Sequence, residues 1–538
     1  MRKRKMWKPL VVGSLLLLGA GACADLEVVN ENDADAARAL SQPGDVESLI
    51  AGAFNTWFNG NYSYDGASMF LSNQAFQHNA PWSNAGMEQY GRLPRVGIVN
   101  DVADNYYGNF TRSWYYNYRA IAALADGLKA LENPDIVDAL GAESVARAKA
   151  YAKFVQGVAH ATIAINYDRG FVVDETTDLT QAQEPQEYTA VMDAALGYFD
   201  EAIALCSTSF SLPFGWMQAD VTNQDLAKLA NSYKARFYTA MARTPSERAA
   251  LDWNNVISWI DNGLQDDFMM YWDWDNGWYN EQLDYAVWPN WTQMAYFIYG
   301  MADPRDNRTY NDWLALDLGT KGNNLPDGTP VLIVTPDTRY PQGTTVEEQR
   351  ANQGAYFRIA RADEAGDTWK KPERGVWRWS WYKHDRFLNY GMDAVFDQPE
   401  MTIAEMHLIK AEGLYRTGDL AGAAAIVNET RTQWGLNATD ANGTNTSCVP
   451  RLPNGQCGSL LEMLKWEKRM ETAHSGIGGA GWFYDSRGWG DLWYETPLQW
   501  PVPCKELQVL QILPCNTYGG PGGEGGAAKS TYAWPFEG

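Results

Sequence analysis

Two stretches of the sequence carry residue types that could bind a ligand by ring stacking and hydrogen bonding. The first is the amide-rich segment 73–84, which begins at Asn73 and contains Trp82 directly after a proline. The second, 272–291, is dense in aromatic and polar side chains, namely Trp272, Trp274, Trp278, Tyr279, Trp288 and Trp291 with Asp273, Asp275 and Asn276. An aromatic ring can cover an apolar ligand face while neighbouring polar groups bind hydroxyls. The candidate ligand-binding residues are therefore Asn73, Trp82, Trp272, Trp274, Trp278 and Trp288, although any one of these tryptophans would fit a core at least as well.

Catalytic chemistry has weaker support. Asp273 and Asp275 lie two residues apart, whereas the two carboxyl groups of a glycosidase flank the scissile bond and usually come from different segments. No Gly-x-Ser-x-Gly, His-Glu-x-x-His or phosphate-binding loop occurs, and none of the five histidines is spaced as a metal-binding pair. We therefore expect no catalytic residue, no metal site and no cofactor. A structural calcium ion at 273–277 stays a minor alternative, because the later ligands of a calcium loop are missing.

The N-terminus is typical of a lipoprotein signal peptide. A basic start is followed by an apolar run from Leu10 to Ala22, which is too short to span a bilayer comfortably and ends in small residues before Cys23. We predict residues 1–22 as the signal peptide, Cys23 as the lipid-modified residue and 23–34 as an exposed acidic tether. An ordinary secretory signal with a coincidental cysteine is the alternative.

The balance of charge narrows the range of partners. The formal net charge is −23, and loss of the five basic residues of the predicted signal peptide makes it −28 (−23 − 5). Nucleic acid and anionic lipid are therefore poor partners. Neutral ligands, or polar ones bound by hydrogen bonds and stacking, fit such a chain better.

The remaining five cysteines predict an oxidising compartment. Cys448 and Cys457 flank a segment rich in turn residues, and Cys504 and Cys515 each come directly after a proline. Two short-range disulfides, Cys448–Cys457 and Cys504–Cys515, are the natural pairing. Cys206 is left over on an apolar helix face, where we expect an inert core thiol.

Helical periodicity dominates two parts of the chain. The segments that it predicts as helices are 35–57, 104–131, 151–165, 191–205, 226–241, 256–264, 403–414, 420–434 and 460–470. From about 268 to 398 the periodicity fades into a stretch rich in Trp, Tyr, Asp, Asn and Gly, where Trp377, Trp379 and Trp381 alternate as in a strand. A loop-rich region of this size is uncommon unless it is functional or otherwise ordered.

The later helices predict stacked pairs. Residues 400–434 form a helix-turn-helix unit of tetratricopeptide-like length, and 222–243 with 252–266 predict a second unit. Such units stack to bury a core and carry no chemistry themselves. In the helix after Cys457, Glu467 falls on the apolar face, where a carboxylate needs a partner, and we expect a structural ion pair with Arg487 or Arg469.

Several motifs along the chain carry a family resemblance. They are Gly44–Leu49, Phe154–Phe171, Tyr198–Ile203, Met406–Glu412 with Thr417–Leu420 and Asn428–Arg431, and, near the C-terminus, Glu467–Glu471, Trp482–Arg487 and Trp500–Pro503. Each motif alone is weak, but together and in this order the chain resembles the SusD/RagB family of outer-membrane lipoproteins. Two features depart from the family pattern. One is the glycine-rich interruption 475–481, which we expect to loop out, and the other is a tail with paired cysteines and the glycine-rich stretch 519–526.

The resemblance implies a mainly α fold. In it, tetratricopeptide-like helix pairs form a right-handed superhelical scaffold, joined to an irregular, loop-rich and Trp-rich ligand-binding portion with short β segments. Residues 35–538 would then be one domain, in which 35–267 and 400–475 are scaffold, 268–399 is the ligand-binding insertion and 476–538 is the closing segment.

The resemblance also implies a function. The chain would be a non-catalytic glycan-binding lipoprotein, lipid-anchored to the outer membrane and exposed on the cell surface, that delivers oligosaccharide to a SusC-like TonB-dependent transporter. Sugar rings expose apolar C–H faces on which the tryptophans named above could stack. Two rivals remain at this point: a surface-anchored helical glycoside hydrolase or lyase, and a tetratricopeptide scaffold that binds a peptide or protein.

Overall fold

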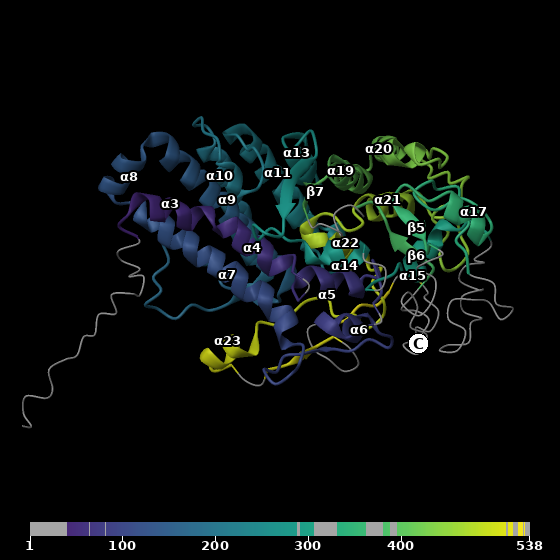
Figure 1. Cartoon of the computed structure of the whole chain (residues 1–538), viewed down its shortest axis with the longest axis horizontal. Helices are drawn as coiled ribbons and strands as arrows, with labels where there is room; N and C mark the ends of the chain where they lie inside the picture. The colour runs from purple at the N-terminus through teal and green to yellow at the C-terminus, as the bar shows by residue number, and fades with distance from the viewer. Residues whose placement is uncertain are drawn as a thin grey trace, which may run out of the picture.

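The structure, a computed structural model of the chain, describes residues 40–63, 65–80, 82–287, 291–305, 331–361, 380–387, 395–512, 515–519, 526–530 and 532. Helices make up most of the regular structure and the strands are short, so the predicted mainly α class is confirmed. In Figure 1, helices from the first half of the chain occupy one end of an elongated molecule, and α20 and α21 with β5 and β6 lie toward the other.

The helices of the described residues are α3 (Pro43–Ala51), α4 (Ala53–Asn61), α5 (Ala67–Gln74), α6 (Met87–Gly91), α7 (Tyr107–Ala130), α8 (Pro134–Leu140), α9 (Ala142–Asn166), α10 (Tyr188–Leu205), α11 (Asn223–Ala240), α12 (Pro245–Ala249), α13 (Trp253–Asp261), α14 (Glu281–Val287), α15 (Tyr296–Tyr299), α17 (Val346–Ala351), α19 (Ile403–Thr417), α20 (Leu420–Gln433), α21 (Leu460–Glu471), α22 (Gly481–Trp489) and α23 (Cys504–Val509). Short 3-10 turns are η1 (Asn84–Gly86), η2 (Phe214–Trp216), η3 (Gly300–Ala302) and η6 (Ile477–Gly479). The antiparallel strand pairs are β1 (Ile98–Val99) with β8 (Thr517–Tyr518), β2 (Arg169–Gly170) with β3 (Gln186–Glu187), β4 (Phe268–Asp273) with β7 (Val395–Met401), and β5 (Phe357–Ile359) with β6 (Tyr382–His384).

Helix α9 is the centre of the N-terminal half. It packs against α7 and α10, and its side chains are buried without interruption from Ala150 to Asn166. The predicted helix 104–131 corresponds to α7. The predicted helix 35–57 is instead two helices, α3 and α4, which are separated at Gly52.

The predicted helix pairs are present in the second half of the scaffold. Helices α11 and α13 pack together, α13 packs on α19, and α19 pairs with α20. A buried cluster of one arginine and two glutamates connects the elements of this stack. Arg236 of α11 contacts Glu400 of β7 at 2.7 Å and Glu405 of α19 at 2.6 Å. Tyr233 of α11 also donates a hydrogen bond to Glu400, at 2.9 Å.

A two-stranded ribbon closes the base of the irregular region. Strand β4 begins at Phe268 and pairs with β7, so that Phe268 lies opposite Met401. These strands stand where the helical periodicity of the sequence fades and returns, and the ribbon brings the two ends of the region together. Of the three alternating tryptophans, Trp377 and Trp379 lie outside the described residues, and Trp381 is buried directly before β6.

The expectation that 475–481 loops out is wrong. Ser475 and Ala480 are buried, and this segment, which contains η6, packs against α5. Gly476 adopts φ +67°, and a Cβ atom there would lie 2.8 Å from the carboxylate of Glu405. The glycines therefore allow the backbone to pass through a tight interior space. From the sequence alone, the same glycine-rich pattern predicts a surface loop.

The expected partners of Glu467 are also wrong. Its carboxylate contacts Arg339 at 2.9 Å and Arg431 at 3.6 Å, all three side chains being buried. Arg487 instead donates to backbone carbonyl oxygens, and Arg469 pairs with an aspartate at 2.6 Å. Arg339 comes from the irregular region, where no periodicity indicated a core position.

The cysteine pairing is confirmed. Cys448 is bonded to Cys457 and Cys504 to Cys515, and Cys206 is a free, buried thiol. Burial raises the pKa of the Cys206 thiol to about 12, which makes the thiolate scarce at neutral pH.

Candidate functional site

The turn after β4 presents one tryptophan to solvent. Two backbone hydrogen bonds close it, from Asp273 N to Trp278 O (3.1 Å) and from Trp278 N to Asp273 O (2.9 Å). The carboxylate of Asp273 also accepts hydrogen bonds from Asp275 N (2.9 Å) and from the side-chain amide of Asn276 (2.6 Å). Held by this closed turn, Trp274 is 61% exposed.

Gly277 fastens the turn to the scaffold. Its φ of +76° lies in the region that favours glycine. Its carbonyl oxygen accepts hydrogen bonds from the side-chain amides of Asn55 and Asn59 of α4, at 2.9 and 3.0 Å. The scaffold therefore fixes the position from which Trp274 projects.

The two tryptophans that flank the turn belong to the core. Trp272 and Trp278 are 1% and 3% exposed. The ring of Trp278 packs 6.2 Å from Phe54 and 5.2 Å from Phe58 of α4, and the ring of Trp272 lies 5.6 Å from Phe58. Both side chains serve packing, and neither is among the residues that line the pocket described below.

Helix α14 supplies the floor of the site. Its residues Gln282, Leu283 and Ala286 are buried, while Glu281, Asp284 and Tyr285 are half-buried on the opposite face. The 3.6-residue repeat of a helix puts positions 281, 284 and 285 side by side. The hydroxyl of Tyr279 donates to Asp284 and holds that carboxylate in place.

The amide-rich segment meets the same place from the other side. Asn79 and Gln293 form an antiparallel bridge, with backbone hydrogen bonds of 2.7 and 2.8 Å. The bridge brings the ring of Trp82 to 5.8 Å from that of Trp291. The two stretches that the sequence singles out therefore converge, although about 200 residues separate them.

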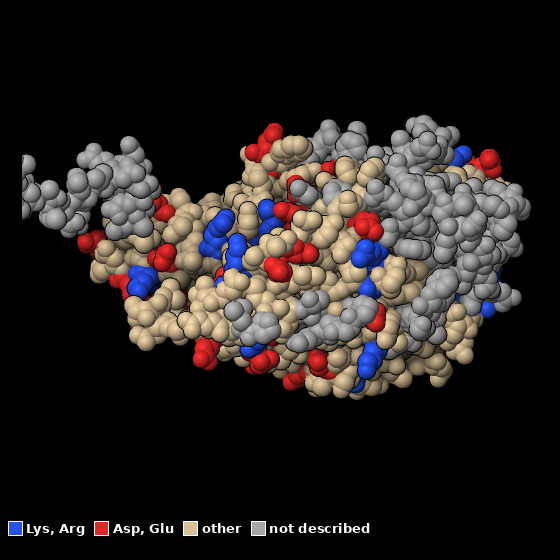
Figure 2. Space-filling model, turned by 90° about the horizontal axis from the view of Figure 1, so that it is seen from below, with Lys and Arg blue, Asp and Glu red and all other residues tan. Residues whose placement is uncertain are grey.

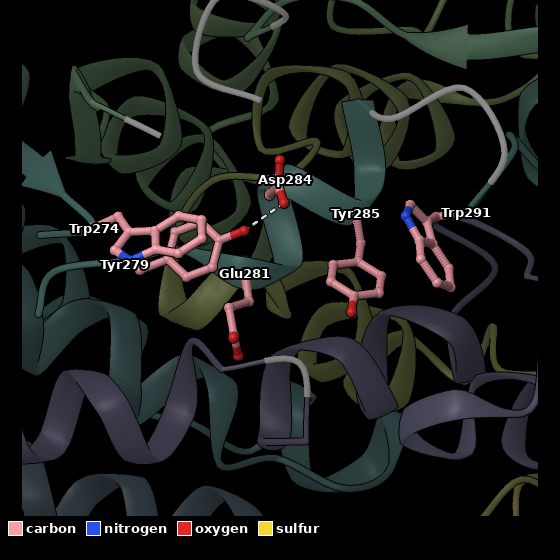
Figure 3. A pocket seen from close by; sticks show the side chains of 6 residues that line it. All are labelled: Trp274, Tyr279, Glu281, Asp284, Tyr285 and Trp291. Carbon is pink, nitrogen blue, oxygen red and sulfur yellow. Dashed lines mark hydrogen bonds between the residues drawn. The ribbon is translucent and has the colours of Figure 1, made fainter. Parts of the chain in front are cut away.

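These parts enclose an open pocket of about 540 Å³, lined by Trp274, Tyr279, Glu281, Asp284, Tyr285 and Trp291. Figure 3 shows Trp274 with Tyr279 on one side and Tyr285 with Trp291 on the other, with Glu281 and Asp284 between them. The ring centroids lie 5.2 Å apart in the first pair and 4.9 Å apart in the second. A volume of this size suits a small-molecule or oligomeric ligand.

The predicted ligand-binding residues have different places. Trp274 lines the pocket, and Trp82 supports it through Trp291. Asn73 is fully buried in α5, where its side-chain amide donates to the carbonyl oxygen of Met69 at 3.0 Å. Trp288 and the predicted lipidation site Cys23 lie outside the described residues.

Three pocket residues were missed because their helix was not predicted. Glu281, Asp284 and Tyr285 lie in the region where helical periodicity fades, so their shared face was not recognised. Tyr279 and Trp291 belong to the aromatic run noted in the sequence but were not chosen as candidates. The sequence did contain a signal for this helix. Polar or aromatic residues at 281, 284 and 285 alternate at helical spacing with Gln282, Leu283 and Ala286, as in an amphipathic helix.

A buried polar cluster lies directly behind α14. The side-chain nitrogens of Gln282 and Gln77 lie 2.8 and 2.9 Å from Nδ1 of His474. Because an amide nitrogen can only donate, this ring nitrogen accepts, and the ring is neutral. Burial, the first cause, and the neighbouring His384 lower the pKa of His474 well below its usual range.

The described residues contain no group of three or more His, Cys, Asp or Glu side chains arranged to hold a metal ion. At the calcium-like sequence 273–277, both oxygens of Asp273 already bind N–H groups of the turn itself. A structural calcium ion there stays an untested alternative.

Comparison with known proteins gives a match of fold. No family model and no curated protein matches the sequence. Among solved structures, a SusD homolog from Parabacteroides distasonis is 13% identical, with a TM-score of 0.50 over 82% of this chain and 84% of that one. A SusD superfamily protein from Bacteroides vulgatus is 14% identical, with a TM-score of 0.49 over 84% and 89%. A structure solved with a xylogluco-oligosaccharide is 13% identical, with a TM-score of 0.47 over 82% of each chain.

Proposed function

We propose that this chain, which has the fold of the SusD-like proteins, is a non-catalytic surface lipoprotein that captures an oligosaccharide in the pocket of Trp274 and Trp291. The observation that carries the proposal is the pair of aromatic walls with carboxylates between them (Figure 3). Sugar rings can stack on such walls while their hydroxyls donate to Glu281 and Asp284.

The rigidity of the pocket supports capture of a ligand. Trp274 stands on a turn held by α4, and Trp291 is fixed between Trp82 and Tyr285. Side chains that are already ordered lose little entropy when a ligand binds, so more of the contact energy appears as affinity.

Binding without hydrolysis is favoured by the arrangement of the two carboxylates that line the pocket. The carboxylates inside it, Glu281 and Asp284, come from the same face of one helix. A glycosidase places its acid and its nucleophile or base on either side of the bond that breaks.

The cellular part of the proposal rests on the N-terminal sequence and the motifs noted above. Cys23 would carry the lipid, the folded body would stand on the outer surface of the outer membrane, and the glycan would pass to a SusC-like TonB-dependent transporter. Within the described part of the chain, no helix combines the length and the apolar character needed to cross a bilayer.

Retention in polysaccharide-containing native gels, together with analysis of soluble products, tests the proposal. The secreted chain would carry Cys23→Ser, and the variants are Trp274→Ala and Tyr285→Ala. The matched control is Phe214→Ala, because Phe214 is also an exposed aromatic residue (46%) and does not line the pocket. We expect retention by at least one polysaccharide, weakening by either pocket variant, no effect of the control and no cleavage products.

Stacking of one sugar ring on an aromatic side chain is expected to contribute about 1 kcal/mol, so Trp274→Ala should weaken binding by about fivefold or more. Cleavage products that persist after repurification would replace the proposal with the hydrolase or lyase alternative. Retention that is equal in all four proteins would show that a glycan binds elsewhere on the surface.

A further inference from the structure

One buried nitrogen atom lies between the two segments that build a wall of the pocket. The side-chain amides of Gln77 and Gln282 both donate to Nδ1 of His474, at 2.9 and 2.8 Å. The amide of Gln282 also donates to Ser72 of α5, at the longer distance of 3.4 Å. Gln77, Gln282 and His474 are all exposed by 1% or less. Because Gln77 belongs to the amide-rich segment and Gln282 to α14, the shared acceptor joins two distant parts of the chain.

Each of these parts carries one ring of the same wall. Tyr285 lies on α14, three residues after Gln282. The backbone bridge between Asn79 and Gln293 joins the amide-rich segment to the stretch that carries Trp291. The rings of Tyr285 and Trp291 meet with their centroids 4.9 Å apart, and Figure 3 shows them together on one side of the pocket. The position of this wall therefore depends on how the two parts are held to each other.

The opposite wall is held from another direction. Trp274 stands on the turn in which the carbonyl oxygen of Gly277 accepts hydrogen bonds from Asn55 and Asn59 of α4. None of these residues takes part in the hydrogen bonds of His474 described above. A change at His474 should therefore disturb the wall of Trp291 more than the place of Trp274.

The backbone around His474 supports a placement that matters. His474 adopts φ +58°, a region that few residues other than glycine, asparagine and aspartate enter readily. The glycine-rich segment 475–481 follows it directly, and a Cβ atom at Gly479 would lie 2.5 Å from Oε1 of Gln282. The segment therefore packs directly on the side chain that His474 binds. Uncommon backbone conformations of this kind persist where the surrounding structure fixes them, and they gather at binding sites.

Building on the function proposed above, we propose that His474 is a positioning residue for the glycan pocket. Its Nδ1 atom, as the shared acceptor of Gln77 and Gln282, holds the wall of Tyr285 and Trp291 in the place where that wall meets the ligand. His474 is buried behind α14, so it acts on a ligand only through this wall. A wall that is already in place loses less entropy when the ligand binds.

Two substitutions at position 474 separate the acceptor from the imidazole ring. Glycine and asparagine both tolerate a positive φ, and both remove the ring, but only asparagine places an acceptor oxygen, Oδ1, where Nδ1 stood. His474→Gly should therefore loosen the wall, and His474→Asn should restore most of its order. Gln77→Met and Gln282→Met remove the donors with little change of volume. They decide the question if His474→Gly fails to fold.

Gln349→Met is the matched control. Gln349 is a fully buried amide that donates to the carbonyl oxygen of Ile333 at 2.9 Å, and it does not line the pocket. All of these substitutions exchange one neutral side chain for another. The acidic and basic side chains that are interspersed on the surface, as on the face drawn in Figure 2, are therefore the same in every protein compared.

The first arm of the test needs no sugar. The full secreted chain with Cys23→Ser is labelled with fluorinated tryptophan, and the variants Trp274→Phe and Trp291→Phe assign two resonances in fluorine NMR spectra. In His474→Gly and in both glutamine variants, the Trp291 resonance should shift and broaden, and the Trp274 resonance should change less. His474→Asn should bring the Trp291 resonance back toward its original place, and Gln349→Met should leave it unchanged.

The second arm measures retention of the same proteins in native gels that contain a polysaccharide bound by the unsubstituted chain. Loss of order in the wall should weaken binding by about fivefold in His474→Gly. Binding should weaken less in His474→Asn, and it should not change in Gln349→Met.

The two arms separate the two ways of failing. The role of His474 is overturned if the Trp291 resonance stays in place in both glutamine variants, or if Trp274 responds as strongly as Trp291. It is also overturned if Gln349→Met has the same effect, or if His474→Asn behaves as His474→Gly, because the acceptor would then have no part. If Trp291 responds as expected but no polysaccharide is retained, the positioning of the wall stands and the proposed function is overturned instead.

Discussion

Mild acid should lower the free energy of unfolding of this protein substantially, because four of its five histidines are buried. His78, His384 and His474 form one cluster, in which the ring centroids of His78 and His474 lie 5.3 Å apart and those of His384 and His474 lie 4.5 Å apart. Lys383, which is also buried, adds a positive charge beside them. His160 is buried in α9, with Nδ1 at 2.8 Å from the carbonyl oxygen of Gln156.

Burial opposes the charged form of each of these rings. It lowers the pKa of His78 to about 3 and that of His160 to about 4, and it is the largest cause that holds the pKa values of His384 and His474 well below the usual range. In the unfolded chain each ring takes up a proton near pH 6.5. The unfolded state therefore binds more protons below that pH, and the free energy of unfolding falls as the pH falls.

The expected loss is large compared with the total stability. Each histidine lowers the free energy of unfolding by about 1.4 kcal/mol for every pH unit below 6.5. At pH 5 the loss is therefore about 2 kcal/mol for each histidine and about 8 kcal/mol for the four together. Domains are commonly stable by only about 5–15 kcal/mol. The buried carboxyl groups of Glu400 and Glu467, whose pKa values burial raises, act in the opposite sense between their unfolded pKa of about 4.3 and their raised folded pKa, and they offset part of this loss.

Urea unfolding between pH 8 and pH 5, followed by tryptophan fluorescence, measures this dependence. The four histidines contribute a slope of about four protons near pH 5, or about 5.4 kcal/mol per pH unit, from which the carboxyl groups with raised pKa subtract. His160→Gln should remove about one proton from the slope, and His407→Gln, at a half-exposed position on α19, is the matched control. A slope of less than one proton between pH 6 and pH 5 would refute the argument, because the histidines would then have to be protonated in the folded state.

Three further changes test other parts of the fold. Gly277→Ala should lower the free energy of unfolding in urea by about 1–2 kcal/mol, because alanine is strained at φ +76°. The same strain would disturb the turn that presents Trp274, so glycan retention should also weaken. Arg339→Met should cost about 3–5 kcal/mol, measured in the same way, because it removes the cation that buried Asp337 and Glu467 share and leaves Glu467 only the longer contact with Arg431. Replacing Cys504 and Cys515 together by serine opens a loop of 11 residues and should lower the unfolding free energy by about 3 kcal/mol without affecting glycan retention.

The scaffold could be predicted from the sequence because its helices obey a local rule. Helices α7, α10, α11, α19 and α20 repeat apolar residues at helical spacing, and the structure has helices in these places. Short-range disulfides follow a similar local rule, and both are present. Where burial depends on distant segments, the local pattern fails. Gly476 and Gly479 are buried because α5 and α19 close around their segment, which no property of the segment itself reveals.

The pocket lies in a stretch of sequence that was predicted to bind a ligand, but two of the tryptophans predicted there are packed in the core. Trp272, Trp274 and Trp278 have the same side chain within seven positions, yet only Trp274 projects outward. The difference arises from contacts with α4, whose Phe54 and Phe58 pack against the inner tryptophans. Since those contacts join positions more than 200 residues apart, residue type and spacing could not separate a core tryptophan from an exposed one.

The two faces of α14 connect the pocket to the buried cluster of His78, His384 and His474. One face carries Glu281 and Asp284 into the pocket, and the other carries Gln282 to within 2.8 Å of the Nδ1 atom of His474. If His474 is protonated, this nitrogen no longer accepts, and the amide nitrogen of Gln282 keeps only the longer hydrogen bond to Ser72 Oγ, at 3.4 Å. Loss of glycan binding and loss of stability should therefore follow the same titration, since the helix that presents the carboxylates is held by the neutral form of a buried histidine.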